Sequence, residues 1–236
     1  MPRTIVVTGA SKGIGRAAAD ALAAGGWSVI GVARAMPADF PGDGIEVDLA
    51  DAGATARLGS LLAARGDVVG VVNNVGLARA ESLGAVDPAA FGDVIDLNVR
   101  PALQLTQALL PAMRAARFGR IVNVSSLVVR GLPFRASYAA AKAALESLTK
   151  TMAIELARDG VTANAVAPGP TDTALFRANN PPGGESEARY LAQTPVGRLG
   201  RPEEIAALIA FLASERAGFV TGQIIGADGG ASLGRA

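Results

Sequence analysis

The sequence contains no histidine and no cysteine. Without cysteine the chain forms no disulfide and has no thiolate nucleophile. Without histidine it lacks the usual base of a Ser-His-Asp triad and the commonest ligand of transition metals, so we expect no metal site. Proton transfer near neutral pH must then fall to a side chain whose pKa is moved far from its ordinary value.

Aromatic residues and an excess of charge are also scarce. Phe, Trp and Tyr make up 4% of the residues, and the formal net charge is +1. Few stacking platforms and no extended basic surface disfavour nucleic-acid binding. The apolar run Ala206–Ala213 is far too short to span a bilayer, and no apolar leader precedes the first expected strand. We therefore expect a cytoplasmic protein without a membrane anchor.

Half of the residues are hydrophobic, and short β-branched segments alternate with longer segments of helical period. This alternation predicts an α/β fold in which a parallel sheet is wrapped by helices. The expected strands are Thr4–Val7, Val29–Val32, Ile45–Val47, Val68–Val72, Arg120–Val124, Val161–Val166 and Ile224–Gly226. The expected helices are Ile14–Ala24, Ala52–Ala64, Phe91–Ala115, Ser137–Arg158 and Glu203–Ala213. Because no linker or change of composition divides the chain, we expect a single domain over residues 1–236.

The pattern fails over residues 174–194, where the run Asn179–Gly184 is rich in Asn, Pro and Gly. This composition predicts a mobile loop, and long loops in compact domains are often functional, so we expect a substrate lid here. A surface insertion without function is the alternative. The lid carries both apolar and charged side chains, and we expect its Arg177 and Arg189 to be solvated.

A glycine-rich turn follows the first expected strand and opens the first helix. Its residues are Thr8, Gly9, Ala10, Ser11, Lys12, Gly13, Ile14 and Gly15. Gly9 permits a tight turn, Gly13 lets phosphates approach the backbone, and Gly15 lets the helix pack closely on the sheet. We expect the amides of residues 11–14 and the helix dipole to hold the pyrophosphate of a dinucleotide. Taken alone the cluster is a weak signal, and a simple strand-to-helix turn is the alternative.

The charges that follow the second expected strand favour NADP(H) over NAD(H). An acidic residue about 20 positions past the glycines holds the ribose hydroxyl of NAD, whereas an arginine accommodates the 2′-phosphate of NADP. Arg34 stands at this place, and Lys12 adds a second cation. Asp39 lies further along and leaves NAD(H) as the alternative.

Tyr138 and Lys142 supply the side chains for proton transfer. Residues four apart on a helix share a face, so the Lys142 ammonium is expected near the Tyr138 oxygen. A neighbouring positive charge favours phenolate and would lower the phenol's pKa from its ordinary value of about 10. Tyr138 would then serve as a general acid or base. An ordinary helix surface is the alternative reading of this pair.

The motifs together resemble the short-chain dehydrogenase/reductase family over essentially the whole chain, and within it carbonyl reductases of the 3-oxoacyl-(acyl-carrier-protein) reductase type. The residues that carry the resemblance are Thr8-Gly9-x3-Gly13-x-Gly15, Asp48, Asn73-Asn74-Val75-Gly76, Asn98, Ser125-Ser126, Tyr138-x3-Lys142, Pro168-Gly169, Thr173, Gly222 and Asp228-Gly229-Gly230. The resemblance implies a doubly wound Rossmann fold with a seven-stranded parallel sheet. It also implies a homotetramer, with helices around Leu103–Met113 and Leu145–Met152 at one interface; their apolar residues fit an intramolecular core equally well.

The resemblance implies further contacts to the dinucleotide. Asp48 and Leu49 would meet the adenine, unless Asp48 merely caps the next helix. Asn74 and Gly76 would support the sheet and line the adenosine site, where Val75 replaces the family's usual alanine. Thr173, after Pro168 and Gly169, would hold the nicotinamide carboxamide or else cap the following segment.

The resemblance also completes the catalytic set. Tyr138 would exchange a proton with the substrate oxygen, and Lys142 would bind the nicotinamide ribose. A serine hydroxyl after the fifth strand would bind the substrate oxygen. Ser125 and Ser126 compete for this role, and we favour Ser126 because the upstream strand fixes its position. Asn98 would organise a water in a proton relay, with a purely structural asparagine as the alternative.

These observations predict an NADP(H)-dependent oxidoreductase that acts on a small carbonyl compound or secondary alcohol. An NAD-linked catabolic alcohol dehydrogenase is one alternative. A dinucleotide-binding regulator without turnover is another. The sequence does not identify the substrate.

Overall fold

The computed structural model describes residues 3–178 and 180–233, so Asn179 of the expected loop and both chain ends lie outside the described residues. All seven strands form one parallel sheet in the order β3-β2-β1-β4-β5-β6-β7. The strands are β1 Thr4–Thr8, β2 Ser28–Ala33, β3 Asp43–Glu46, β4 Val68–Asn73, β5 Gly119–Val124, β6 Val161–Pro168 and β7 Ile224–Ala227. The predicted parallel seven-stranded sheet is confirmed.

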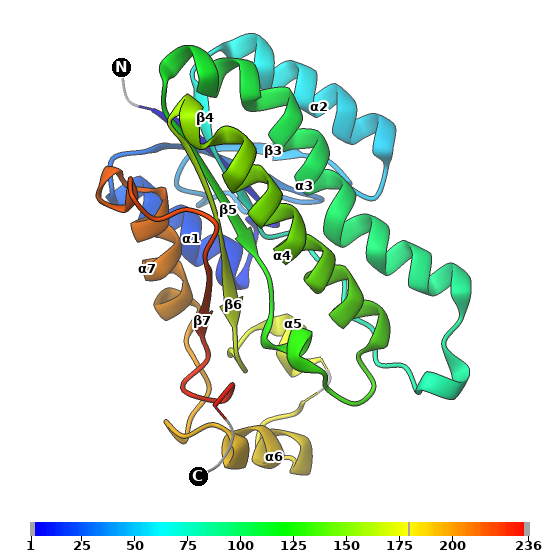
Figure 1. The fold of residues 1–236 in the computed structure, drawn as a ribbon. Coiled ribbons are helices and arrows are strands. Elements are labelled where there is room, and N and C mark those ends of the chain that lie inside the picture. Colours follow the sequence, from blue (N-terminus) through cyan, green and yellow to red (C-terminus); the bar gives the residue numbers. More distant parts are fainter. Residues whose placement is uncertain (1–2, 179, 234–236) are drawn as a thin grey trace.

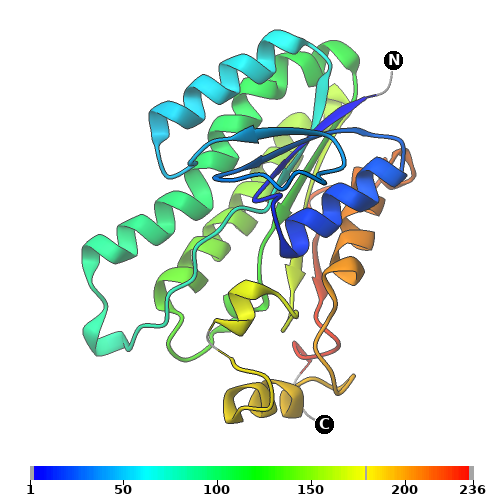
Figure 2. The same ribbon diagram turned by 180° about the vertical axis from the view of Figure 1, so that it is seen from behind.

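Helices cover both faces of the sheet, as the doubly wound fold requires (Figures 1 and 2). The longer helices are α1 Gly13–Ala24, α2 Ala52–Arg65, α3 Pro88–Ala116, α4 Ala136–Leu156 and α7 Pro202–Ala213. Short 3-10 turns lie at Leu83–Ala85, Leu127–Arg130, Ala157–Asp159 and Glu215–Ala217. Helices α1 and α7 pack together on one face, whereas α2, α3 and α4 cover the other. Each face has its own cluster of buried apolar side chains.

The helix starts follow local chemistry. The carboxylate of Asp51 accepts a hydrogen bond from the Ala54 N–H and caps α2. Asp87 caps α3 in the same way, and Pro88 occupies the first turn, so this helix begins three residues before the predicted Phe91. Gly25 ends α1 as its spacing predicts.

The connection between β2 and β3 contains no helix among its described residues 34–42. Parallel strands usually need a longer crossover that covers the sheet. Here the side chains of Met36 and Phe40 cover β2 instead. They pack so closely on Gly31 that a Cβ atom there would lie only 2.3 Å from the Phe40 ring. The short connection leaves Arg34 exposed at the carboxyl end of β2.

Residues 174–194 are more ordered than predicted. They contain two helices, α5 Ala174–Arg177 and α6 Glu185–Gln193, so the expectation of an irregular loop was wrong. The rings of Phe176 and Tyr190 meet edge to face at 5.3 Å between centroids and join the two helices. Figure 2 shows both helices, in yellow and gold, beyond the carboxyl ends of β6 and β7.

Candidate active site

The carboxyl ends of the strands bring the predicted residues to one edge of the sheet. The strand order reverses between β1 and β4, and open α/β sheets bind ligands outside the strand ends at such a reversal. The glycine turn follows β1, the Asn74–Gly76 segment follows β4, the two serines follow β5, and Gly169 follows β6. The sequence residues therefore converge where a dinucleotide binds in this fold.

Two of the three motif glycines adopt backbone angles that other residues rarely take. The φ angles of Gly9 and Gly13 are 65° and 57°. Gly15 is required by space, since a Cβ atom there would lie 2.2 Å from the carbonyl oxygen of Gly9. These three residues fit the predicted roles of turn, open backbone and close helix packing.

Asn74 ties the glycine turn to the next strand. Its Nδ2 donates to the carbonyl oxygens of Thr8 at 2.9 Å and Gly9 at 3.2 Å. The Thr8 hydroxyl in turn accepts the N–H groups of Asn74 and Val75. Asn74 therefore supports the architecture of the cleft, and Val75 packs against the core without disturbing it.

Thr173 lies opposite the glycine turn. Its γ-methyl would be 3.4 Å from a Cβ atom on Gly13, and no other residue comes within 4 Å of that position. Its hydroxyl also caps α5 by accepting the Phe176 N–H at 3.2 Å. Pro168 ends β6, and Gly169 approaches Asp228 so closely that a Cβ atom would lie 2.6 Å from the Asp228 Cα. Thr173 and Gly169 thus lie beside the glycine turn and the strand ends, where this fold would hold a dinucleotide.

Two exposed cations and one paired acid follow β1 and β2, where the 2′-phosphate of NADP is expected. Lys12 and Arg34 are exposed. Arg16, which the sequence reading did not single out, binds the Asp39 carboxylate at 3.0 Å and also its carbonyl oxygen. The pKa of Asp39 is lowered by these hydrogen bonds and the Arg16 charge. Asp39, the acid that could have favoured NAD(H), is therefore paired with Arg16 on α1.

Asp48 does not cap α2, since Asp51 does so. Its carboxylate accepts the Ala50 N–H at 3.0 Å and shapes the turn after β3, while the side chain remains exposed. Leu49 is buried. The Asp48 carboxylate therefore keeps a free face for hydrogen bonding.

Ser126 and Tyr138 form the centre of the candidate site. The Ser126 hydroxyl lies close enough to the Tyr138 phenol to lower its pKa. It also accepts the Val128 N–H at 3.3 Å, at the start of a 3-10 turn. Ser125 points elsewhere, because its hydroxyl donates to Glu146 Oε1 at 2.6 Å. Of the two competing serines, Ser126 is the one whose hydroxyl meets the phenol.

The pKa of Tyr138 is raised, not lowered as predicted from the Lys142 charge. Burial raises the pKa of Tyr138 to about 12, against the opposing effects of the Ser126 hydrogen bond and the Arg135 charge. The Lys142 ammonium instead donates to the Val124 carbonyl oxygen at 2.8 Å and lies 5.6 Å from the centre of the phenol ring. Desolvation therefore outweighs the Arg135 charge in its effect on this pKa.

Lys142 and Asn98 meet beneath Gly76. Lys142 is only 2% exposed, and burial lowers its pKa to about 8. Asn98 is equally buried, and its Nδ2 donates to the carbonyl oxygens of Leu77 and Val94. Its Oδ1 has no hydrogen-bond partner among the described residues. A Cβ atom on Gly76 would lie 2.7 Å from this oxygen and 3.4 Å from Lys142 Nζ.

The helices expected at a subunit interface mainly fill the chain's own core. Leu105, Leu109 and Met113 of α3 and Leu145 and Met152 of α4 are buried within the chain. The large apolar side chains left outside are Phe91 and Leu103 on α3 and Ile154 on α4. The core alternative therefore accounts for most of these residues.

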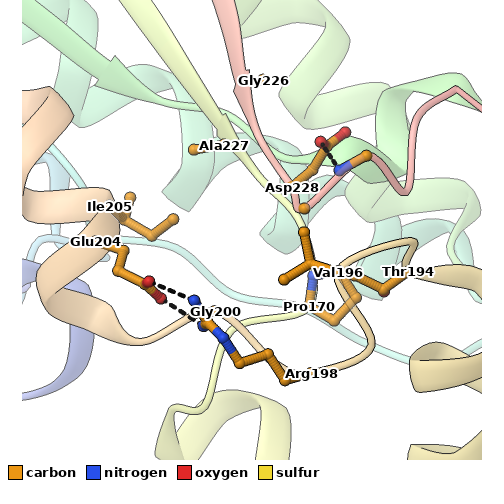
Figure 3. A pocket seen from close by; sticks show the side chains of 12 residues that line it. Pro170, Thr194, Val196, Arg198, Gly200, Glu204, Ile205, Gly226, Ala227 and Asp228 are labelled. Atoms are coloured by element: carbon orange, nitrogen blue, oxygen red, sulfur yellow. Dashed lines mark hydrogen bonds and ion pairs between the residues drawn. The ribbon is translucent and has the colours of Figure 1, made fainter.

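A pocket lies at the carboxyl ends of β6 and β7, next to Gly169. It has a volume of about 390 Å³ and is bounded by the segment after α6, the start of α7 and the turn after β7. Figure 3 shows Arg198 and Glu204 paired at its rim and the Asp228 carboxylate turned to the backbone. None of the predicted catalytic side chains lines it.

The described residues lack two other kinds of feature. None of their helices is long and apolar enough to cross a membrane. Within the same residues, acidic side chains form no cluster of three that could hold a metal ion.

The fold and the strand-end site define a nicotinamide-dinucleotide-dependent oxidoreductase. The profile described as enoyl-(acyl carrier protein) reductase matches residues 9–232. The chain is 39% identical over 235 residues to 3-oxoacyl-(acyl-carrier-protein) reductase FabG of Escherichia coli (strain K12), with 95% of each chain covered. It is also 39% identical over 239 residues to the acetoacetyl-CoA reductase of Rhizobium meliloti (strain 1021), with 98% of each covered.

Solved structures agree. A Beutenbergia cavernae protein described as an NAD(P)-dependent gluconate 5-dehydrogenase, with bound NADP, superposes with a TM-score of 0.90 at 36% identity, covering 98% of this chain and 96% of its own. The protein belongs to the short-chain dehydrogenase/reductase family.

Proposed function

We propose that this oxidoreductase transfers hydride between NADP(H) and a carbonyl compound or its secondary alcohol, with Tyr138 as the general acid and base. The observation that carries the proposal is the contact of the Ser126 and Tyr138 hydroxyls at the strand ends, with Lys142 one helical turn away. When bound, the reduced nicotinamide supplies the hydride to the carbonyl carbon. Residues 1–236 would form one dinucleotide-binding domain, with residues 174–194 as the lid.

In the direction of reduction, the Tyr138 phenol donates its proton to the carbonyl oxygen, and Ser126 hydrogen-bonds the same oxygen as negative charge develops there. A phenol with a raised pKa is fully protonated at neutral pH and ready to act as the acid. Lys142, charged below about pH 8, then stabilises the phenolate and binds the ribose. The unpartnered Oδ1 of Asn98 beside Lys142 suits a water that returns the proton from solvent.

The cofactor contacts are assigned by position. Gly9, Ser11, Lys12, Gly13, Ile14 and Gly15 would bind the pyrophosphate; Asp48, Leu49, Asn74 and Gly76 the adenosine; and Pro168, Gly169 and Thr173 the nicotinamide. Arg34 and Lys12 would bind the 2′-phosphate, a preference supported by their exposure and by the pairing of Asp39 with Arg16. An equal or tighter dissociation constant for NADH than for NADPH would favour the NAD-linked alternative.

The substrate belongs to one of the classes that the relatives' names record. These are 3-oxoacyl thioesters and sugar acids. A homotetramer and a cytoplasmic location remain our expectations from the family resemblance.

The test is oxidation of NADPH over a panel of ketones and 3-oxoacyl thioesters. Tyr138→Phe should lower kcat by about 10²- to 10⁴-fold, because it removes the acid and keeps the ring. The variant should still bind NADPH, which separates lost chemistry from lost folding. Unchanged turnover would overturn the phenol mechanism, and absence of turnover in the wild type would favour a regulator.

The same assay separates the two serines. Ser126→Ala should reduce kcat strongly, whereas Ser125→Ala should lose only the hydrogen bond to Glu146. The reverse order would move the catalytic role to Ser125.

A further inference from the structure

Arg135 stands out among the arginines that are not exposed. The others each hold several acceptors: Arg16, Arg100, Arg120 and Arg177. Within the part of the chain that the structure describes, the Arg135 guanidinium has no hydrogen bond or ion pair, and its Nη1 is fully buried without a partner. A buried charged donor without an acceptor is costly, so such a group calls for a ligand or another specific role.

The backbone holds Arg135 at the mouth of the site. Arg135 immediately precedes α4 and stands three residues before Tyr138. It forms a parallel bridge with Glu81, whose N–H donates to the Phe134 carbonyl oxygen at 3.0 Å. Phe134 has a φ of 62°, a conformation that a phenylalanine rarely adopts unless its surroundings impose it. These contacts hold the backbone of Arg135 against the Glu81 segment.

The acidic neighbour does not neutralise Arg135. The Glu81 carboxylate accepts a hydrogen bond from the Ser137 hydroxyl and makes no ion pair with the guanidinium. The uncompensated charge reaches the reacting group, since it lowers the pKa of Tyr138 against the larger effect of burial. The guanidinium, with its unpartnered Nη1, is therefore near the phenol, one helical turn before it along the chain.

The lid offers no equivalent cation. Arg177 is bound by Asp172 at 2.6 Å and by Glu187 at 2.5 Å, and Arg189 is exposed. Among the described arginines that are not exposed, Arg135 is thus the one whose guanidinium is left without an acceptor.

We infer that Arg135 is a specificity-determining residue that binds a carboxylate on the substrate, within a few bonds of the carbonyl or alcohol carbon. A planar guanidinium matches a carboxylate with two parallel N–H donors, and the pair would satisfy the buried Nη1. This inference rests on the proposed oxidoreductase function and narrows its substrate to oxo acids and hydroxy acids.

The experiment compares acetoacetate with methyl acetoacetate, which differ in the negative charge. The wild type should prefer the acid in kcat/KM. Arg135→Gln should lower kcat/KM for the acid by about 10- to 100-fold, mainly through KM, and leave the ester within about twofold, as expected for loss of one charge-assisted hydrogen-bonded pair. Arg135→Lys should restore part of the preference.

Arg158→Gln is the matched control, because it removes an exposed positive charge just beyond the other end of α4. It should change neither substrate. Equal losses for acid and ester in Arg135→Gln would mean that Arg135 acts on the phenol or on folding, and would overturn the inference. A wild type that reduces the ester but not the acid would also overturn it. If no carbonyl compound on the panel is reduced, the proposed function fails instead.

Discussion

The cleft at the strand ends and the proposed lid, residues 174–194, differ in how their polar and charged side chains are paired. In the cleft, burial lowers the pKa of Lys142 and raises that of Tyr138, while Asn98 Oδ1 lacks a partner. In the lid, Arg177 binds two carboxylates near the surface. The cleft thus holds unsatisfied polar groups that a ligand would complete, whereas the lid satisfies its own. Such a contrast is the usual mark of a site selected for function at a cost in stability.

Lys142→Met should have the largest effect, because it removes the buried charge that distinguishes the cleft from residues 174–194. The change should abolish turnover, because it removes the charge that stabilises the phenolate. It should also stabilise the protein at neutral pH: a pKa lowered from 10.5 to about 8 corresponds to about 3 kcal/mol, and the lost hydrogen bond to Val124 offsets about 1 kcal/mol. Thermal or urea unfolding without dinucleotide measures the difference.

The pH dependence of this difference has a definite sign. Because the folded-state pKa of Lys142 lies below the unfolded value, the unfolded chain binds more protons between pH 8 and 10.5. The unfolding free energy of the wild type therefore rises relative to that of Lys142→Met as the pH rises through that window. The difference in stability between the two proteins should shrink. Lys150→Met, at an exposed position on α4, should show no such trend. If Lys142→Met were less stable than the wild type at pH 7, the buried ammonium would not destabilise the folded protein.

Gly15→Ala tests whether the cleft is as rigid as its packing indicates. The new Cβ atom would lie 2.2 Å from a backbone oxygen that cannot move without disturbing the glycine turn. We expect a loss of about 1–3 kcal/mol in unfolding free energy, together with weaker NADPH binding. Gly92→Ala is the matched control, since a Cβ atom in α3 there meets nothing within 4 Å. The control should be neutral or slightly stabilising.

The same contrast explains what the sequence predicted well. The central strands are apolar runs buried on both faces, such as Val68–Asn73, and their pattern can be recognised without knowing which strands lie beside them. The glycine turn was predicted because its backbone angles and close contacts allow few residue types. Backbone constraints of this kind limit the residue types at neighbouring positions, so a short stretch of sequence is enough to predict them.

Other features depend on distances that spacing does not give. The sign of the Tyr138 pKa shift follows from the depth of burial and from the turning of Lys142 towards Val124. The choice between Ser125 and Ser126 needed the position of Glu146. Arg135 was missed, although its place three residues before Tyr138 was a usable signal. Helix α6 was missed because it has only nine residues and follows a Pro-Gly run. So short a helix spans too few turns for its hydrophobic period to be recognised.

Glu187→Gln gives the smallest expected effect and tests the lid side of the comparison. The Glu187 carboxylate accepts the Gly183 N–H at 2.6 Å and binds Arg177, and both contacts lower its pKa. The amide imitates the protonated acid, so it should loosen the link between α5 and α6. We expect faster hydrogen exchange in residues 174–194 and a KM raised by at most about fivefold with kcat unchanged, because ion pairs near the surface contribute little. Glu185→Gln removes the same charge at an exposed position on α6 and serves as the control. If Glu187→Gln lowered kcat as severely as a change in the cleft, the lid would belong to the catalytic machinery and the division between the two regions would be wrong.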